Sequence, residues 1–295
     1  MNRFINKFWS LIDLDFEALA KSSEVDKVIQ YLRYFYLIVF VISIQMFNHI
    51  RPAVMQPPQD LLYVWPIQWI PNTMFKYLGP FVGITGILSS ILCFFYIHKK
   101  IFKVTSFISL FMFWAIVFAF NNYIFHSMHI MIISLFLLCL LPSDLKKSKT
   151  LEKNVEILKG IWLVVFFILL TYTCAGLSKF IGSFYDLYEG GISMYNIDHL
   201  NTILTQYWEQ KTSDQIFSRF IISNNFISFL SFLFVLMVEF FAVLAAFRTK
   251  YLQLMGLLLI VFHFFAGSIL GDEFPTAITM IAYWLIANPL ASLRK

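Results

Sequence analysis

Long apolar runs, each bounded by polar or charged residues, make up most of the chain. Runs of about 20 residues can cross the hydrocarbon core of a bilayer as helices. Runs that reach or approach this length lie at 31–48, 75–97, 101–120, 127–141, 160–181, 226–247, 251–270 and 274–288. We expect the fourth and eighth, which are shorter, to be tilted or partly covered by neighbours. The pattern predicts an all-α, polytopic transmembrane helical bundle of about eight spans.

The first 30 residues have a different pattern. Apolar side chains recur there at helical spacing between charged ones. These apolar positions are Phe4, Phe8, Leu11, Ile12, Phe16 and Leu19. The pattern predicts an amphipathic helix over 1–30 that lies at the membrane surface, followed by a transmembrane domain over 31–290 and a tail over 291–295. The segment lacks the apolar core and small-residue cleavage site of a signal peptide.

Composition supports a membrane protein, with the lipid bilayer as its first partner. The chain is 59% hydrophobic and 13% charged, whereas soluble domains carry about a quarter charged residues. The net charge of +5 fits basic loops and does not indicate nucleic acid. Cys93, Cys139 and Cys174 lie in apolar runs without a CxxC pair, so we expect buried free thiols. The chain has no Walker loop, GxSxG or HExxH motif, so nucleotide and soluble-type hydrolase chemistry lack support.

Basic residues concentrate in alternate connections, which predicts the orientation in the membrane. The basic side is defined by Lys7, Lys21, Lys27, Lys99, Lys100, Lys103, Lys146, Lys147, Lys149, Lys153, Lys159, Arg248, Lys250, Arg294 and Lys295. We therefore expect a multi-pass protein of the inner (plasma) membrane with both termini cytoplasmic. The opposite side then carries a long extracytoplasmic loop over 182–225.

A lysine in an apolar span needs an explanation. Tyr172, Ala175, Gly176 and Lys179 share one helical face at spacings of three, four and seven. Because Ala175 and Gly176 would let another helix come close, we expect this face to point into the bundle. Lys179 could extend its amine to the outer headgroups, or act as a base when desolvated.

Histidines form a second group near the outer face. Asn122, His126 and His129 share a helical face, and His263 lies in the outer half of its span. The three histidines could bind a metal, but no nearby cysteine or carboxylate completes the set, so no metal is expected. Hydrogen bonding to a quinone or carbonyl ligand, or packing at the membrane boundary, are the other interpretations.

Acidic residues are rare in the spans. Glu239 lies mid-span with no charge within eight residues on either side, so it should be protonated or paired. Arg248 or a polar group of another span could be its partner. Asp272 and Glu273 follow His263 in a turn with a polar lining.

Four stretches, in this order, carry a resemblance to a known family. They are WPIQW at 65–69, HSMHI at 126–130, YTCAGLSKF at 172–180 with EGGISMY at 189–195, and FH at 262–263 with GDEFP at 271–275. Over roughly 30–290 the chain resembles the membrane module shared by vitamin K-dependent gamma-carboxylases and the horizontally transferred transmembrane (HTTM) domain family, in a small bacterial form.

The resemblance implies roles for particular residues. Lys179 matches the base that deprotonates reduced vitamin K, whose reaction with oxygen yields an epoxide and a strong base that takes a proton from a peptide glutamate. His126 matches a histidine near the quinone, and His263 one that lines the same cavity. Further quinone-binding candidates are Asn122, His129, Tyr172 and Trp69, and the candidates for substrate contact or other roles are Glu239, Asp272 and Glu273.

The implied cofactor is a menaquinone or vitamin K-like quinone in its hydroquinone form, with oxygen and carbon dioxide as co-substrates. Ser178 replaces a lysine found beside the base in the carboxylases, which leaves carboxylation of glutamate open. Small bacterial members of the family include maturation proteins for secreted peptide toxins. The natural substrate is therefore a small secreted peptide or protein, and a membrane or secreted subunit is a further candidate partner.

Three functions remain open from the sequence. The first is a membrane enzyme that uses reduced quinone and oxygen to modify a peptide or protein at the extracytoplasmic face. The second is a non-enzymatic factor for maturation or export of a secreted peptide of the toxin type. The third is a transporter with Glu239 and Lys179 as a proton relay, although the chain shows no inverted repeat.

Overall fold

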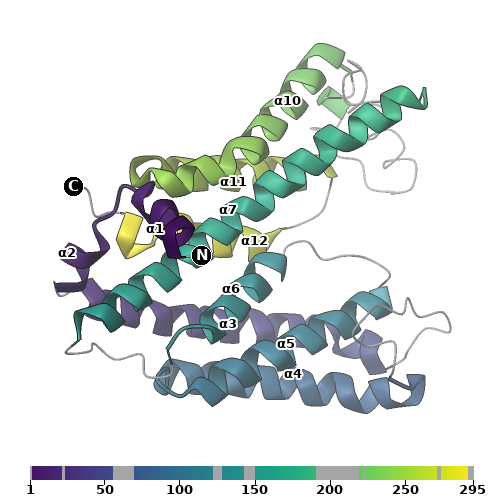
Figure 1. The fold of residues 1–295 in the computed structure, drawn as a ribbon. Helices are drawn as coiled ribbons and strands as arrows, with labels where there is room; N and C mark the ends of the chain where they lie inside the picture. Colours follow the sequence, from purple (N-terminus) through teal and green to yellow (C-terminus); the bar gives the residue numbers. More distant parts are fainter. Residues whose placement is uncertain are drawn as a thin grey trace. The chain divides into compact units, whose positions relative to one another are not determined.

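The computed structural model describes residues 2–21, 24–55, 70–121, 128–142, 150–190, 219–221, 223–270 and 274–291. Every regular element within these ranges is a helix (Figure 1). Six of the helices are long and apolar enough to cross a membrane. The predicted all-α, polytopic bundle is confirmed.

The helices follow the apolar runs of the sequence. The long ones are α3 (Glu24–Met55), α4 (Asn72–Phe95), α5 (Lys100–Asn121), α7 (Leu151–Tyr188), α10 (Asn225–Phe241) with its 3₁₀ continuation η2 (Ala242–Phe247), and α11 (Thr249–Leu270). The fourth and eighth runs form the shorter helices α6 (His129–Cys139) and α12 (Pro275–Ile281), the latter continued by η3 (Ala282–Ile286). A last short turn, η4, spans Pro289–Ala291.

The N-terminal segment is divided where a single helix over 1–30 was expected. It forms α1 (Asn2–Ser10), α2 (Phe16–Lys21) and the first turns of α3. The segment between α1 and α2 contains Asp13 and Asp15, and each of their carboxylates accepts a hydrogen bond from a backbone amide in the first turn of a helix. Asp15 accepts from Ala18 at 3.0 Å, and Asp13 accepts from Thr249 at the start of α11 at 2.9 Å.

The chain forms two compact units. Unit 1 contains residues 1–14, 165–287 and 291–295, and unit 2 contains residues 15–164 and 288–290. In unit 2, α3, α4 and α5 pack on one another and α6 packs on α5 (Figure 1). Their core includes Phe75, Val82, Phe113 and Ile116.

Unit 1 holds the second part of α7 together with α10, η2, α11, α12 and η3. In this unit α11 packs against α10, α12 and η3. Phe8 of α1 makes edge-to-face contacts with Phe166 of α7 and Phe247 of η2. The aromatic contacts, and the hydrogen bond that Asp13 accepts from the Thr249 amide, attach the N-terminal helix to this unit.

The predicted loop over 182–225 begins later than expected. Residues 182–188 continue α7, and the hydrogen bond of 2.6 Å from Tyr185 to Glu189, four residues on, supports the last turn. The helix ends at Tyr188, and Gly190, two residues on, has a positive φ of 73° that glycine adopts without strain. Asn224 then caps α10 by accepting from the Ile227 amide at 3.1 Å. Residues 191–218 lie outside the described part of the chain.

The surface of the spans suits lipid. In the most apolar window of each long helix, no more than half of the residues are buried. Large apolar side chains such as Phe81, Phe95, Leu140 and Phe264 are exposed along the helices. A soluble domain keeps exposed apolar patches small, so these faces indicate contact with a bilayer.

Two expectations about single residues need correction. Cys93 and Cys139 are buried free thiols as expected, but Cys174 is exposed. It lies two residues from Tyr172 and from Gly176, both buried, and residues two apart point to different sides of a helix. Lys103, expected in a basic connection, belongs to α5 and is fully buried.

Candidate functional site

Helix α7 approaches α10 at a glycine, as the small residues predicted. A Cβ atom on Gly176 would lie 2.9 Å from the amide nitrogen of Phe240 and 3.1 Å from the Cβ of Glu239. Real Cβ atoms are not found this close to backbone. The absence of a side chain at Gly176 therefore brings the face of α7 that carries Tyr172 and Lys179 against Glu239.

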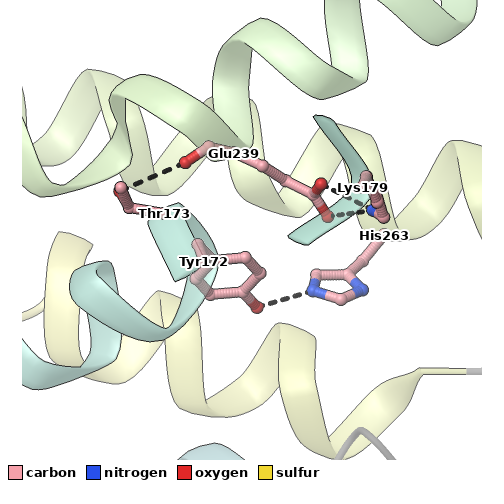
Figure 2. Close-up of polar contacts among 5 residues, drawn as sticks. All are labelled: Tyr172, Thr173, Lys179, Glu239 and His263. Carbon is pink, nitrogen blue, oxygen red and sulfur yellow. Dashed lines mark hydrogen bonds and ion pairs between the residues drawn. The ribbon is translucent and has the colours of Figure 1, made fainter. Parts of the chain in front are cut away.

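Lys179 and Glu239 form an ion pair within unit 1 (Figure 2). The amine of Lys179 donates to both carboxylate oxygens of Glu239, at 2.7 Å to Oε1 and 2.5 Å to Oε2. The two side chains differ in exposure, 41% for Lys179 and 4% for Glu239. The partner of Glu239 is thus a charged group of another span, one of the two alternatives that the sequence allowed.

Tyr172 and His263 form a second polar pair, one that joins α7 to α11 (Figure 2). The Tyr172 hydroxyl lies 2.6 Å from Nε2 of His263. The other ring nitrogen, Nδ1, is buried and has no hydrogen-bond partner among the described residues. The tautomer decides whether Nδ1 donates or accepts. As a donor Nδ1 can bind a carbonyl or hydroxyl oxygen, and as an acceptor it can bind the O–H group of a hydroxyl.

Aromatic rings surround the two pairs. The amine of Lys179 lies 5.9 Å from the centre of the Phe262 ring, and the His263 ring lies 5.3 Å from that of Phe274. Phe240, next to Glu239, packs against Phe180 of α7. Apolar rings around a few polar groups are typical of sites for small organic molecules.

A threonine completes the site, and the sequence analysis did not select it. The hydroxyl of Thr173 donates to the carbonyl oxygen of Glu239 at 3.3 Å (Figure 2). The same hydroxyl accepts from the Val243 amide at 3.0 Å. Helix α10 changes to the 3₁₀ segment η2 at Ala242, directly after this contact. A hydroxyl in the middle of an apolar run was the available signal, but its role depends on a partner 66 residues away.

The structure brings together four of the predicted site residues, which are Lys179, Tyr172, His263 and Glu239. His129 belongs to unit 2, where its ring lies edge-on to Trp114 at 5.4 Å. The remaining predicted site residues, Asn122, His126, Trp69, Asp272 and Glu273, lie outside the described residues. Within the described ranges, no three His, Cys, Asp or Glu side chains are close enough to hold a metal ion.

The arrangement provides acid–base chemistry in a membrane helix bundle. Lys179 with Glu239, and Tyr172 with His263, are pairs in which a proton can lie on either partner. The chain matches no protein-family model, no curated protein and no solved structure.

Proposed function

We propose that the chain is an integral membrane enzyme that uses a reduced quinone and oxygen to modify a peptide or protein at the extracytoplasmic face. The observation that supports this proposal most is the contact of Lys179 with buried Glu239 beside the Tyr172–His263 pair. The resemblance to vitamin K-dependent carboxylases assigns Lys179 the role of base. The proposed orientation, with both termini cytoplasmic in the plasma membrane, places this group near the outer side.

The residues of the site fit a hydroquinone. Nδ1 of His263 is buried without a partner in the described part of the chain, and a hydroxyl group of a hydroquinone could donate to it or accept from it, whichever tautomer is present. Lys179 uses two hydrogen bonds on Glu239, and an ammonium has three N–H groups to donate. Nearby rings such as Phe262 and Phe274 offer faces and edges to a flat aromatic molecule. A bound hydroquinone would supply an acidic hydroxyl and the electrons for the reaction with oxygen.

Proton transfer then depends on the chain's own residues. With a hydroquinone bound, Lys179 would first pass one of its protons to Oε2 of Glu239, and the lone pair freed on Nζ would then take the proton of the hydroxyl group. The transfer would leave Lys179 as an ammonium, as before, and would neutralise the carboxylate of Glu239, so the charge that remains lies on the more exposed residue. A neutral carboxylic acid is the form that a buried site tolerates best. Glu239 is thus the final proton acceptor and Lys179 the relay.

The test is quinone turnover by purified protein in detergent. Reduced menaquinone or vitamin K is supplied with oxygen, and quinone epoxide is measured by mass spectrometry. We expect epoxide from the wild type and at least about 100-fold less from Lys179→Ala. Cys174→Ala is the matched control, because Cys174 lies on the same helix but is exposed. Equal turnover by Lys179→Ala, or no epoxide from folded wild type offered a candidate peptide, would overturn the proposal.

One observation also favours a proton-coupled transporter. Lys179 and Glu239, the two residues of the suggested relay, are in direct contact in the structure. Intramembrane carboxylates and lysines in contact are typical of proton pathways. A transporter predicts proton uptake into proteoliposomes that Glu239→Gln abolishes, together with no epoxide in the assay above.

A further inference from the structure

Helix α10 loses its regular hydrogen bonding directly after Glu239. In an α-helix the Val243 amide would donate to the carbonyl oxygen of Glu239, four residues earlier. In this protein it donates to the Thr173 hydroxyl at 3.0 Å, and that hydroxyl donates to the Glu239 carbonyl at 3.3 Å. Thr173 of α7 is therefore inserted between two backbone groups that would otherwise bond each other.

The insertion satisfies both groups inside an apolar span. Free amide and carbonyl groups cost several kcal/mol in the membrane, and a hydroxyl can donate and accept at once. The Ala242 amide also donates to the Glu239 carbonyl, with the three-residue spacing of a 3₁₀ helix. The amides of Ala242 and Val243 and the carbonyl of Glu239 are thus all hydrogen-bonded at the break, and Thr173 makes two of these bonds.

The same stretch of α7 contacts Glu239 three times. Thr173 binds its carbonyl, Gly176 lies against its Cβ, and Lys179 binds its carboxylate. The three residues follow one another at a spacing of three, along one side of the helix. The backbone and the side chain of Glu239 are therefore both fixed from α7.

Thr173 does not follow the usual pattern of a threonine in a membrane helix. Such hydroxyls commonly bond the carbonyl four residues earlier in their own helix. Thr171, two residues before, does so with the Phe167 carbonyl at 2.8 Å. Thr173 instead bonds the backbone of another helix, next to the proposed proton acceptor.

We infer that Thr173 is a positioning residue, which holds the backbone of Glu239 so that its carboxylate meets the amine of Lys179. The inference rests on the proposed function of that pair. Without the hydroxyl, the Val243 amide can bond the Glu239 carbonyl directly, so α7 loses its hydrogen bonds to the α10 backbone and no longer holds α10 where the carboxylate of Glu239 meets Lys179. The expected effect of Thr173→Val is therefore a longer distance between the amine and the carboxylate.

Reaction with a hydrophobic carbodiimide reports whether the amine of Lys179 and the carboxyl group of Glu239 are in contact, and it needs no substrate. The reagent adds to the Glu239 carboxyl group to give an O-acylisourea. If the amine of Lys179 is in contact, it attacks the acyl carbon, forms an amide between α7 and α10 and releases the urea. If it is not, the same adduct rearranges to an N-acylurea on Glu239. Mass spectrometry of the two products gives a ratio that does not depend on how much reagent enters.

We expect wild type, Thr173→Ser and Thr171→Val to give the same ratio of amide to N-acylurea. In Thr173→Val the ratio should fall about tenfold, because this attack depends on near contact of the reacting atoms. Thr173→Ala compared with Thr173→Ser provides the same contrast if the valine variant does not fold. A wild-type ratio in folded Thr173→Val or Thr173→Ala, or a low ratio in Thr173→Ser, would overturn the inference.

The cross-linking result and the quinone assay can fail separately. Absence of epoxide would overturn the proposed function and leave the placement of Glu239 by Thr173 intact. An unchanged ratio in Thr173→Val would overturn the placement while the effect of Lys179→Ala on turnover stands.

Discussion

Two lysines lie in apolar helices of this protein, and their surroundings differ. Lys179 in unit 1 is 41% exposed and contacts a carboxylate. Lys103 in unit 2 is fully buried and donates to the carbonyl oxygen of Pro142 at 3.3 Å, just beyond the end of α6. The thiols of Cys93 and Cys139 and the amine of Lys100 also interact electrostatically with it.

The difference shows why only one of the two is a candidate base. A backbone carbonyl accepts a hydrogen bond but not a proton, whereas the carboxylate of Glu239 accepts both. Lys103 lies near the C-terminal end of α6, where a cation stabilises the carbonyl groups of a helix. The Cys139 thiol donates a hydrogen bond to the backbone carbonyl oxygen of Lys103 at 3.3 Å. Burial of a lysine alone therefore does not indicate chemistry, and the partner decides.

The largest effect should come from replacing Lys179 by a cation that cannot lose its proton. Lys179→Arg keeps the charge and the pair with Glu239, but arginine stays protonated in proteins. We expect epoxide formation to fall by at least about 100-fold while the midpoint of thermal unfolding stays within about 2 °C. Full turnover in the arginine variant would show that the pair acts through its charge alone.

The next effect concerns the free energy of unfolding. Lys179→Met leaves the buried carboxylate of Glu239 without its partner, which should cost about 2–3 kcal/mol. The double variant Lys179→Met/Glu239→Met removes both ions and should recover most of this loss. Unfolding of both variants by SDS in mixed micelles measures the difference. A double variant less stable than Lys179→Met would contradict this view of the pair.

A smaller loss is expected where α7 and α10 meet. Gly176→Ala forces a methyl group against the Phe240 amide and should reduce the free energy of unfolding by about 1–3 kcal/mol. Gly182→Ala on the same helix, with no atom within 4 Å of the new Cβ, should be neutral or stabilising by up to about 1 kcal/mol. Equal results for the two glycines in the same unfolding assay would argue against the close approach.

The smallest effect should be that of Lys103→Met. Exchange of a buried cation for an apolar side chain of similar length is often neutral or stabilising, so we expect the free energy of unfolding to change by less than about 1 kcal/mol. Epoxide formation should be unchanged. A loss above about 2 kcal/mol would show that the bond to Pro142 stabilises unit 2 more than the burial of an ammonium costs.

Much of the fold could be predicted, because apolar runs and helix length are local properties of a sequence. The short fourth and eighth runs appear as α6 and as α12 with η3. The face shared by Tyr172, Gly176 and Lys179 also follows from helical spacing. The continuation of α7 through Gly182 was not predicted from the sequence. A glycine within a helix lowers the stability of the helix by only about 1 kcal/mol, and the other residues of that turn outweigh this loss.

The pairs in the site were less predictable, because they join positions far apart in the chain. Glu239 lies 60 residues from Lys179, and His263 lies 91 residues from Tyr172. Periodicity identifies the side of a helix that is buried but not the residue that it meets. The role of Thr173 was the hardest to predict. It depends on the absence of the regular hydrogen bond from the Val243 amide to the Glu239 carbonyl, since that amide donates to Thr173 instead.

Helix α7 is longer than a bilayer is thick. Its 38 residues extend about 57 Å, while the hydrocarbon core of a bilayer is about 30 Å thick. Even at a tilt of about 40° the helix covers about 44 Å along the membrane normal. Part of α7 therefore extends beyond the hydrocarbon core at any tilt up to this value. Lys179 is paired within the protein with Glu239 of α10, so the ion pair itself does not depend on a lipid headgroup at a particular depth.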